Sequence, residues 1–190
     1  MTDDDAACGE ESNLVGFYSG VIADNRGRRL ADIQAWSFDE LEHTHDYIQW
    51  MFPLRKHSPV NPSAPVLDAE AIAAFRSRQD LRNAFVRSVE TMLRFYGFEL
   101  DGSGDEPKVH CSEQFESRAS NWMTPGNHNH LRMTRILACM RTIGFSRHAE
   151  AFFRALQEVY WSEAQARIHA ISEESFSFWK SAAGMGKPDR

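Results

Sequence analysis

Apolar residues in this chain recur at intervals of three and four positions, and this periodicity limits the fold more than any other feature. The clearest segment ends at Gly97. Its apolar side is formed by Leu81, Phe85, Val89, Met92 and Tyr96. Such spacing places the side chains on one face of an α-helix. No stretch alternates convincingly with the two-residue period of a strand, and no internal repeat is present. The sequence therefore predicts an all-α fold, a single irregular bundle of about six to eight helices.

The composition suits one domain. A chain of 190 residues with 42% hydrophobic and 25% charged residues can bury one sizeable core. No apolar run reaches the length of a membrane span, and no secretory leader opens the chain. Three cysteines without a CxxC spacing fit a reducing compartment. We expect a protein of the cytoplasm, or of the nucleus in a eukaryote, and not a secreted one.

Composition also predicts the organisation along the chain. Residues 1–12 are acidic and small, and we expect a disordered leader there. Residues 13–182 form the predicted helical domain, and residues 183–190 a flexible tail. Within the domain, residues 54–65 are too rich in proline for a helix, so this connector should cross the surface in an extended conformation. Residues 101–110 are expected to form a polar loop.

The densest run of aromatic, imidazole and amide side chains lies just before Pro53. Ser37 and Glu40 have the spacing of a capping box, which predicts a helix start at Ser37. Proline lacks an N–H and disfavours helix in the preceding residue, so a single helix should end near Met51. Further helix starts are predicted at Asp68 and at Asn127 or Asn129, because such side chains cap free N–H groups.

A histidine cluster in this run raises the question of a metal. His43, His45 and Asp46 could act together with His128 as a metal-dependent or small-molecule enzyme site. Glu42-x-x-His45 matches the spacing of a di-iron helix, but that site needs a second such motif, which the sequence lacks. Nucleophile-elbow, Walker and zincin motifs are absent too. We predict no cofactor, no metal and no catalytic residue, and keep the enzyme as an alternative.

Two arginines share a helix face with a histidine. His128, Arg132 and Arg135 fall at positions i, i+4 and i+7, beside a helix start whose free N–H groups favour anions. The alternative is that these arginines pair with acids of a neighbouring helix. A net charge of −6 argues against nonspecific nucleic-acid binding. The basic run from Arg132 to Arg147, with Arg135 and Arg141, keeps nucleic-acid or nucleotide binding as a third hypothesis.

Three blocks of sequence stand out together. They are LEHTHDYIQWMFPL at 41–54, MLRFYGFEL at 92–100 and HNHLRMTRIL at 128–137. Their sequences, order and spacing resemble the conserved N-terminal region of the opioid growth factor receptor family, over residues 14–156. The departures are small: Met51 and Met133 replace other aliphatic residues, and His130 replaces an asparagine.

The resemblance implies a receptor-like role without established catalytic residues. The best-known family members bind an enkephalin-type pentapeptide, lie at the nuclear envelope and restrain cell proliferation. They also carry a long C-terminal extension, so this sequence is interpreted as a stand-alone form. An architectural interpretation is open as well, because aromatic and aliphatic residues of the blocks could simply meet in the core.

We predict a non-enzymatic module that binds a peptide or protein segment. Its groove is expected between the helix that ends at Pro53, the proline-rich connector and the helix start near Asn127. A small molecule or an anion is an open alternative as ligand, and the oligomeric state is open. The candidate contacts are Tyr47, Gln49, Trp50, Trp122, His128, Asn129, Arg132 and Arg135.

Overall fold

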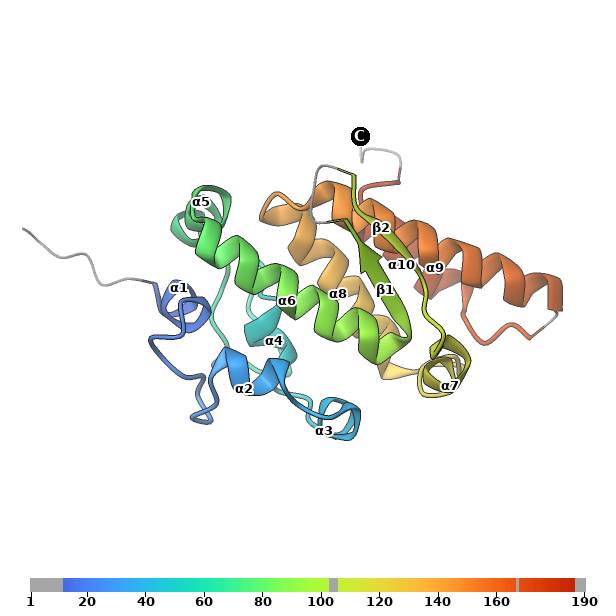
Figure 1. Cartoon of the computed structure of the whole chain (residues 1–190), viewed down its shortest axis with the longest axis horizontal. Helices are drawn as coiled ribbons and strands as arrows, with labels where there is room; N and C mark the ends of the chain where they lie inside the picture. Colours follow the sequence, from blue (N-terminus) through green and yellow to red (C-terminus); the bar gives the residue numbers. More distant parts are fainter. Residues whose placement is uncertain (1–11, 103–105, 167, 187–190) are drawn as a thin grey trace, which may run out of the picture.

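The computed structural model describes residues 12–102, 106–166 and 168–186, and it is mostly helical (Figure 1). The described residues form α1 (Asn13–Tyr18), α2 (Leu30–Gln34), α3 (Phe38–His43), α4 (Ile48–Met51), α5 (Ala69–Ser77), α6 (Gln79–Tyr96), α7 (Phe115–Ala119), α8 (His128–Thr142), α9 (Ser146–Ala166) and α10 (Glu173–Ala182), with strands β1 (Phe98–Asp101) and β2 (Lys108–Cys111). The all-α prediction is confirmed in its main feature. Almost all of the predicted leader and the end of the predicted tail lie outside the described residues.

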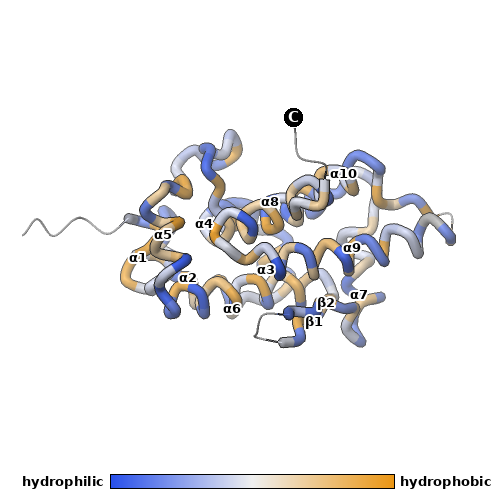
Figure 2. Tube along the Cα trace, turned by 90° about the horizontal axis from the view of Figure 1, so that it is seen from above, coloured by the Kyte–Doolittle hydropathy of each residue, from blue (hydrophilic) through white to orange (hydrophobic). Residues whose placement is uncertain are grey.

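The long helix α6 organises the N-terminal half of the fold. Helices α1, α2 and α5 pack along it, and β1 and α7 contact it at its other end (Figure 1). The second half is built from α8, which packs against α9 and α10, while α9 also contacts β2. One continuous hydrophobic core joins the two halves. Along α6 and α9, hydrophobic and hydrophilic stretches alternate as amphipathic helices require (Figure 2). Within the described part of the chain, no helix combines the length and apolar character needed to cross a bilayer.

Several predicted helix boundaries are confirmed. The Ser37 hydroxyl accepts from the Glu40 N–H at 3.3 Å, and the Glu40 carboxylate accepts from the Ser37 N–H at 2.8 Å. Asp68 caps α5 through the Ala71 N–H, and Asn127 caps α8 through the Asn129 N–H. Each side chain satisfies N–H groups that a helix start leaves without partners.

The prediction of one helix from Ser37 to Met51 was wrong. Helix α3 ends at His43, Thr44 is extended (φ −96°, ψ 131°), and the chain turns before α4 begins at Ile48. Asp46 lies in this break, where its carboxylate pairs with Arg28 at 2.8 Å and with Arg26 at 3.2 Å. The break exposes carbonyl groups that a continuous helix would have used, and it divides one predicted helix into two. Arg132 satisfies these groups, as described below.

The predicted loop at 101–110 was also partly wrong. Its described residues contribute to an antiparallel hairpin in which Phe98 pairs with Cys111 and Asp101 with Lys108. On β1, the alternation of apolar and polar residues that is typical of a strand involves only two apolar residues, Phe98 and Leu100. A period of two over four residues is too short to stand out from a helical pattern, so the sequence does not predict these strands.

His130 connects three parts of the second half. Its Nε2 donates to the Trp122 carbonyl at 2.9 Å, its Nδ1 lies 3.3 Å from the Ser175 hydroxyl, and its own carbonyl accepts from the Trp179 indole at 2.9 Å. The imidazole is buried, and burial lowers the pKa of His130, with His128 acting in the same direction. At the pH at which an exposed histidine is half protonated, the His130 imidazole is therefore mostly neutral.

We expect the domain to lose stability as the pH falls below about 6.5, the ordinary pKa of a histidine in the unfolded chain. Below that pH the unfolded state binds a proton that folded His130 resists, so the free energy of unfolding falls by up to about 1.4 kcal/mol per pH unit until the lowered pKa is reached. Urea unfolding between about pH 5 and pH 7.5 measures this, above the range in which most carboxylates titrate. The variant His130→Asn should show a shallower dependence, and an unchanged slope would contradict this role of His130.

Candidate functional site

A groove lies between α4, the proline-rich connector and α8. It has a volume of about 450 Å³, and we call it the α4–α8 groove. Its apolar lining residues are Ile48, Leu54, Pro59, Val60, Leu131 and Ala138. Its polar lining residues are His45, Gln49, Ser58, His128, Arg132, Thr134 and Arg135. A mixed lining of this size is typical of sites that hold a short segment or a small molecule.

Arg132 forms one wall of the groove and holds the break between α3 and α4 in place. One guanidinium nitrogen donates to the Leu41 carbonyl at 3.0 Å, and the other to the carbonyls of Glu42 at 3.3 Å and Thr44 at 2.8 Å. The second nitrogen also lies 2.9 Å from His45 Nδ1. Arg132 is buried, and its planar, multiply donating head suits a cluster of helix-end carbonyls.

A chain of polar contacts continues from Arg132 across α8 to α3. Asn129 accepts from Arg132 at 3.2 Å and donates to the Glu42 carboxylate at 3.1 Å. The other Glu42 oxygen lies 3.5 Å from His128 Nε2, and the rings of His128 and His45 meet edge to face at 5.2 Å. Burial and the nearby Arg132 charge lower the pKa of His128, so its imidazole is neutral at neutral pH.

Two residues that line the groove have polar groups with capacity for a further hydrogen bond or ion pair. The Gln49 Oε1 atom is buried and has no hydrogen-bond partner among the described residues. Arg135 donates to the Phe52 carbonyl at 3.1 Å, but forms no ion pair within the described part of the chain. Burial lowers the pKa of Arg135, which still stays far above neutrality because guanidinium is so strong a base. The groove therefore offers a half-buried cation and an amide whose oxygen needs a donor.

The structure brings four of the eight predicted contact residues into this groove: Gln49, His128, Arg132 and Arg135. The other four are buried. Tyr47 donates to the Leu41 carbonyl, Trp122 donates to the Tyr96 carbonyl, Trp50 packs on Phe17, and Asn129 belongs to the polar chain. These four side chains present no free surface to a ligand.

The histidine cluster of the enzyme hypothesis is divided in the structure. His43 contacts Asp39 on its own helix, and Asp46 pairs with Arg26 and Arg28 of the segment between α1 and α2. Of the four residues in this cluster, only His45 and His128 contact each other. Among the described residues, no group of three or more His, Cys, Asp or Glu side chains is arranged to hold a metal ion.

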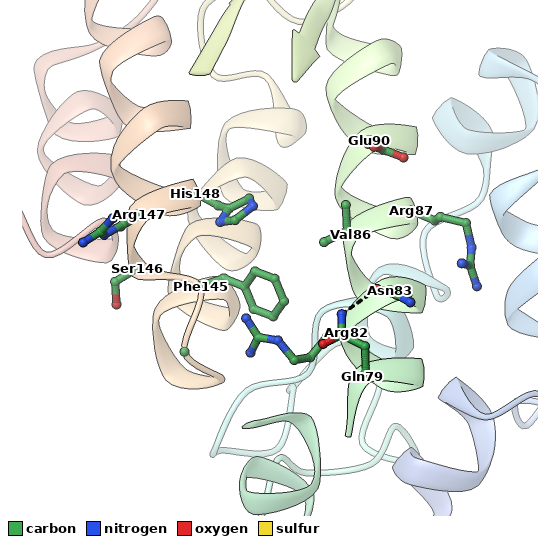
Figure 3. Close-up of a pocket in the computed structure, with 11 residues that line it drawn as sticks. Gln79, Arg82, Asn83, Val86, Arg87, Glu90, Phe145, Ser146, Arg147 and His148 are labelled. Atoms are coloured by element: carbon green, nitrogen blue, oxygen red, sulfur yellow. Dashed lines mark hydrogen bonds between the residues drawn. The ribbon is translucent and has the colours of Figure 1, made fainter. Parts of the chain in front are cut away.

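The basic run of the third hypothesis does not form one surface either. Arg132 and Arg135 line the α4–α8 groove, while Arg141 donates to the Ser181 carbonyl at the end of α10. Arg147 lines a separate cavity of about 780 Å³ between α6 and α9 (Figure 3). In that cavity Arg82 reaches over the Phe145 ring at 4.3 Å, and Arg147 points away from α6 (Figure 3). A long nucleic acid would need these charges on one face.

Val60 and Leu131 line the groove but are not among the predicted contact residues. Their side chains are 79% and 69% exposed, among the most exposed large apolar residues described. The signal was present in the sequence. Leu131 lies outside the apolar stripe of its helix, formed by Met133, Ile136, Leu137 and Met140, and Val60 stands alone in a polar connector. An apolar residue on the polar face of a helix indicates a binding surface better than an apolar residue in the buried stripe does.

Fold and groove together define a helical domain with a mixed apolar and basic groove. Comparison with known sequences then shows its family. Residues 10–183 match the opioid growth factor receptor (OGFr) conserved region, and the chain belongs to this family.

Individual relatives agree with this assignment. The opioid growth factor receptor of Rattus norvegicus is 35% identical over 161 residues, which cover 83% of this chain and 27% of the receptor. The human receptor is 35% identical over 139 residues, covering 72% and 20% of the two chains. Opioid growth factor receptor-like protein 1 of Xenopus tropicalis is 34% identical over 110 residues, covering 57% and 20%. The chain thus spans about a fifth to a quarter of the length of these relatives, and no solved structure matches it.

Proposed function

We propose that this chain is a non-enzymatic module that binds an extended peptide segment of a protein partner in the α4–α8 groove. The observation that carries the proposal is the pair of exposed aliphatic side chains, Val60 and Leu131, on a groove that also contains unsatisfied polar groups. Soluble proteins seldom leave large apolar side chains beside such a cavity unless something covers them. The relatives are named as receptors, which agrees with a binding role.

The polar groups favour a peptide over a purely apolar ligand. The Gln49 amide can turn to meet a backbone N–H and C=O, which every peptide supplies. A buried acceptor left without a partner costs about 1–3 kcal/mol, and a ligand that satisfies it recovers part of that cost. The Arg135 guanidinium can bind a carboxylate of the ligand, because none of the described acidic side chains forms an ion pair with it. A location in the cytoplasm or nucleus stays a prediction of the sequence.

The test is selection of peptides from a random library on the purified chain, followed by affinity measurement with three variants. Val60→Asp and Leu131→Asp place a charge on the apolar part of the groove without disturbing the core. Val21→Asp is the matched control, since Val21 is 66% exposed and does not line the groove. We expect selected peptides to lose about tenfold or more in affinity for the two groove variants, the loss expected of a central interface contact, and none for Val21→Asp.

Two results would overturn the proposal. One is a library that yields no peptide with measurable affinity for the folded chain. The other is a set of peptides that bind Val60→Asp and Leu131→Asp as tightly as the unchanged protein, which would place peptide binding on another surface.

A further inference from the structure

A second pocket, remote from the groove, is lined by residues of β2, α7, α9 and the segment that follows α9. Its volume is about 290 Å³, and its walls are mainly apolar, with Phe115, Met123, Val159 and Ile168 among them. A space of this size holds a molecule of about ten non-hydrogen atoms, by comparison with the size of ordinary ligand pockets. No sequence pattern predicts this pocket.

The notable residue of this pocket is Glu163 on α9. Its side chain is only 3% exposed. Its Oε2 accepts from the Ile171 N–H at 3.3 Å, but its Oε1 has no hydrogen-bond partner among the described residues. A carboxylate oxygen that is buried without a partner is costly, and native proteins rarely contain one without a reason.

The electrostatic surroundings make a cation the natural partner of Glu163. A second carboxylate, Glu158, lines the same pocket, and no lysine or arginine is found among the described lining residues. Burial raises the pKa of Glu163, while His169 partly offsets this effect. Burial and the charge of Glu158 likewise raise the pKa of the Cys111 thiol at the pocket edge. Burial is the main cause of both shifts.

We propose that this pocket binds a primary ammonium group on an apolar stem, with Glu163 as the acceptor and the Phe115, Met123 and Val159 side chains around the stem. The ammonium supplies the donor that Oε1 lacks and the charge that compensates two carboxylates. The stem fills the apolar space. An amine of this kind can be a free small molecule or the side chain of a lysine.

The experiment measures binding to the full chain by calorimetry or by NMR shifts, with benzylamine and with lysine blocked at both ends as probes. Benzyl alcohol is the matched neutral probe, because it has the same shape without the charge. We expect saturable binding of an amine and at least about tenfold weaker binding of the alcohol, since the charge-assisted hydrogen bond is lost. Tighter binding of benzylamine indicates a free amine as ligand, and tighter binding of the blocked lysine indicates a side chain of a partner.

Variants connect the binding to Glu163. Glu163→Gln keeps an oxygen for the Ile171 N–H and removes a poorly solvated charge, so the variant should fold and yet lose amine binding by about tenfold or more. Glu174→Gln on α10 is the control, because Glu174 is exposed and does not line the pocket. Its affinity for the amine should equal that of the unchanged protein.

Failure of both amines to bind, equal binding of benzyl alcohol, or full binding by folded Glu163→Gln would each overturn the proposal. None of these results affects the peptide groove, which shares no residue with this pocket.

Discussion

Replacing Arg132 with methionine is expected to lower the free energy of unfolding by about 3–5 kcal/mol, the cost of leaving buried polar groups without their partner. Methionine keeps the length of the side chain but none of the donors. The carbonyls of Leu41, Glu42 and Thr44 would lose the guanidinium that satisfies them. Asn129 would lose a donor as well. The measurement is urea unfolding followed by circular dichroism.

Two matched variants make this result specific. Arg132→Lys retains the charge but cannot reach all the carbonyls, so its loss should be intermediate. Arg87→Met removes an exposed arginine from α6 and should change stability by less than about 0.5 kcal/mol. A stability of Arg132→Met equal to that of Arg87→Met would show that the carbonyl contacts contribute little. The expected loss also means that Arg132 variants are poor probes of ligand binding, for which Val60 and Leu131 are better suited.

Replacing Gly97 with alanine is expected to destabilise the domain by about 2–4 kcal/mol, through the combined cost of backbone strain and overpacking. Gly97 ends α6 with φ +90°, and an added Cβ would lie 2.8 Å from the Phe115 Cα and 3.0 Å from the Arg118 Cβ. The backbone of α7 cannot move away without disturbing its packing on α6.

Gly27→Ala separates the two costs. Gly27 also has a positive φ, +79°, but a Cβ there would meet nothing within 4 Å. This variant should lose only about 1 kcal/mol, the penalty of a left-handed conformation for a residue with a side chain. Equal losses at Gly27 and Gly97 in urea unfolding would contradict the steric argument.

Local signals predicted the fold well where they acted over a few residues. The capping box at Ser37, the cap at Asp68 and the helix end at Gly97 are each properties of one short segment, and all are confirmed. The break after His43 could not be predicted in this way. It depends on Arg132, which lies 88 positions after the Thr44 carbonyl that it binds. No periodicity within the α3–α4 segment reports a partner so far along the chain.

For the candidate site, too, local sequence signals were predictive and long-range contacts were not. The position of the groove follows from three segments with recognisable local character, and a groove does lie between them. The assignment of single residues was harder, because burial decides it. Tyr47, Trp50 and Trp122 have the chemistry of ligand contacts, yet their rings fill the core. Glu163 was missed because nothing in its neighbourhood distinguishes an enclosed glutamate from an exposed one.

The dependence of α3 and α4 on α8 also has a consequence in time. On a ribosome that adds about 5–20 residues per second, Thr44 is joined to the chain roughly 4–18 s before Arg132, which lies 88 positions later. During this interval the carbonyls of the segment around Thr44 have only water as a partner. The N-terminal third therefore reaches its final form late in synthesis, and a fragment that stops before α8 should leave this segment open to proteases and chaperones.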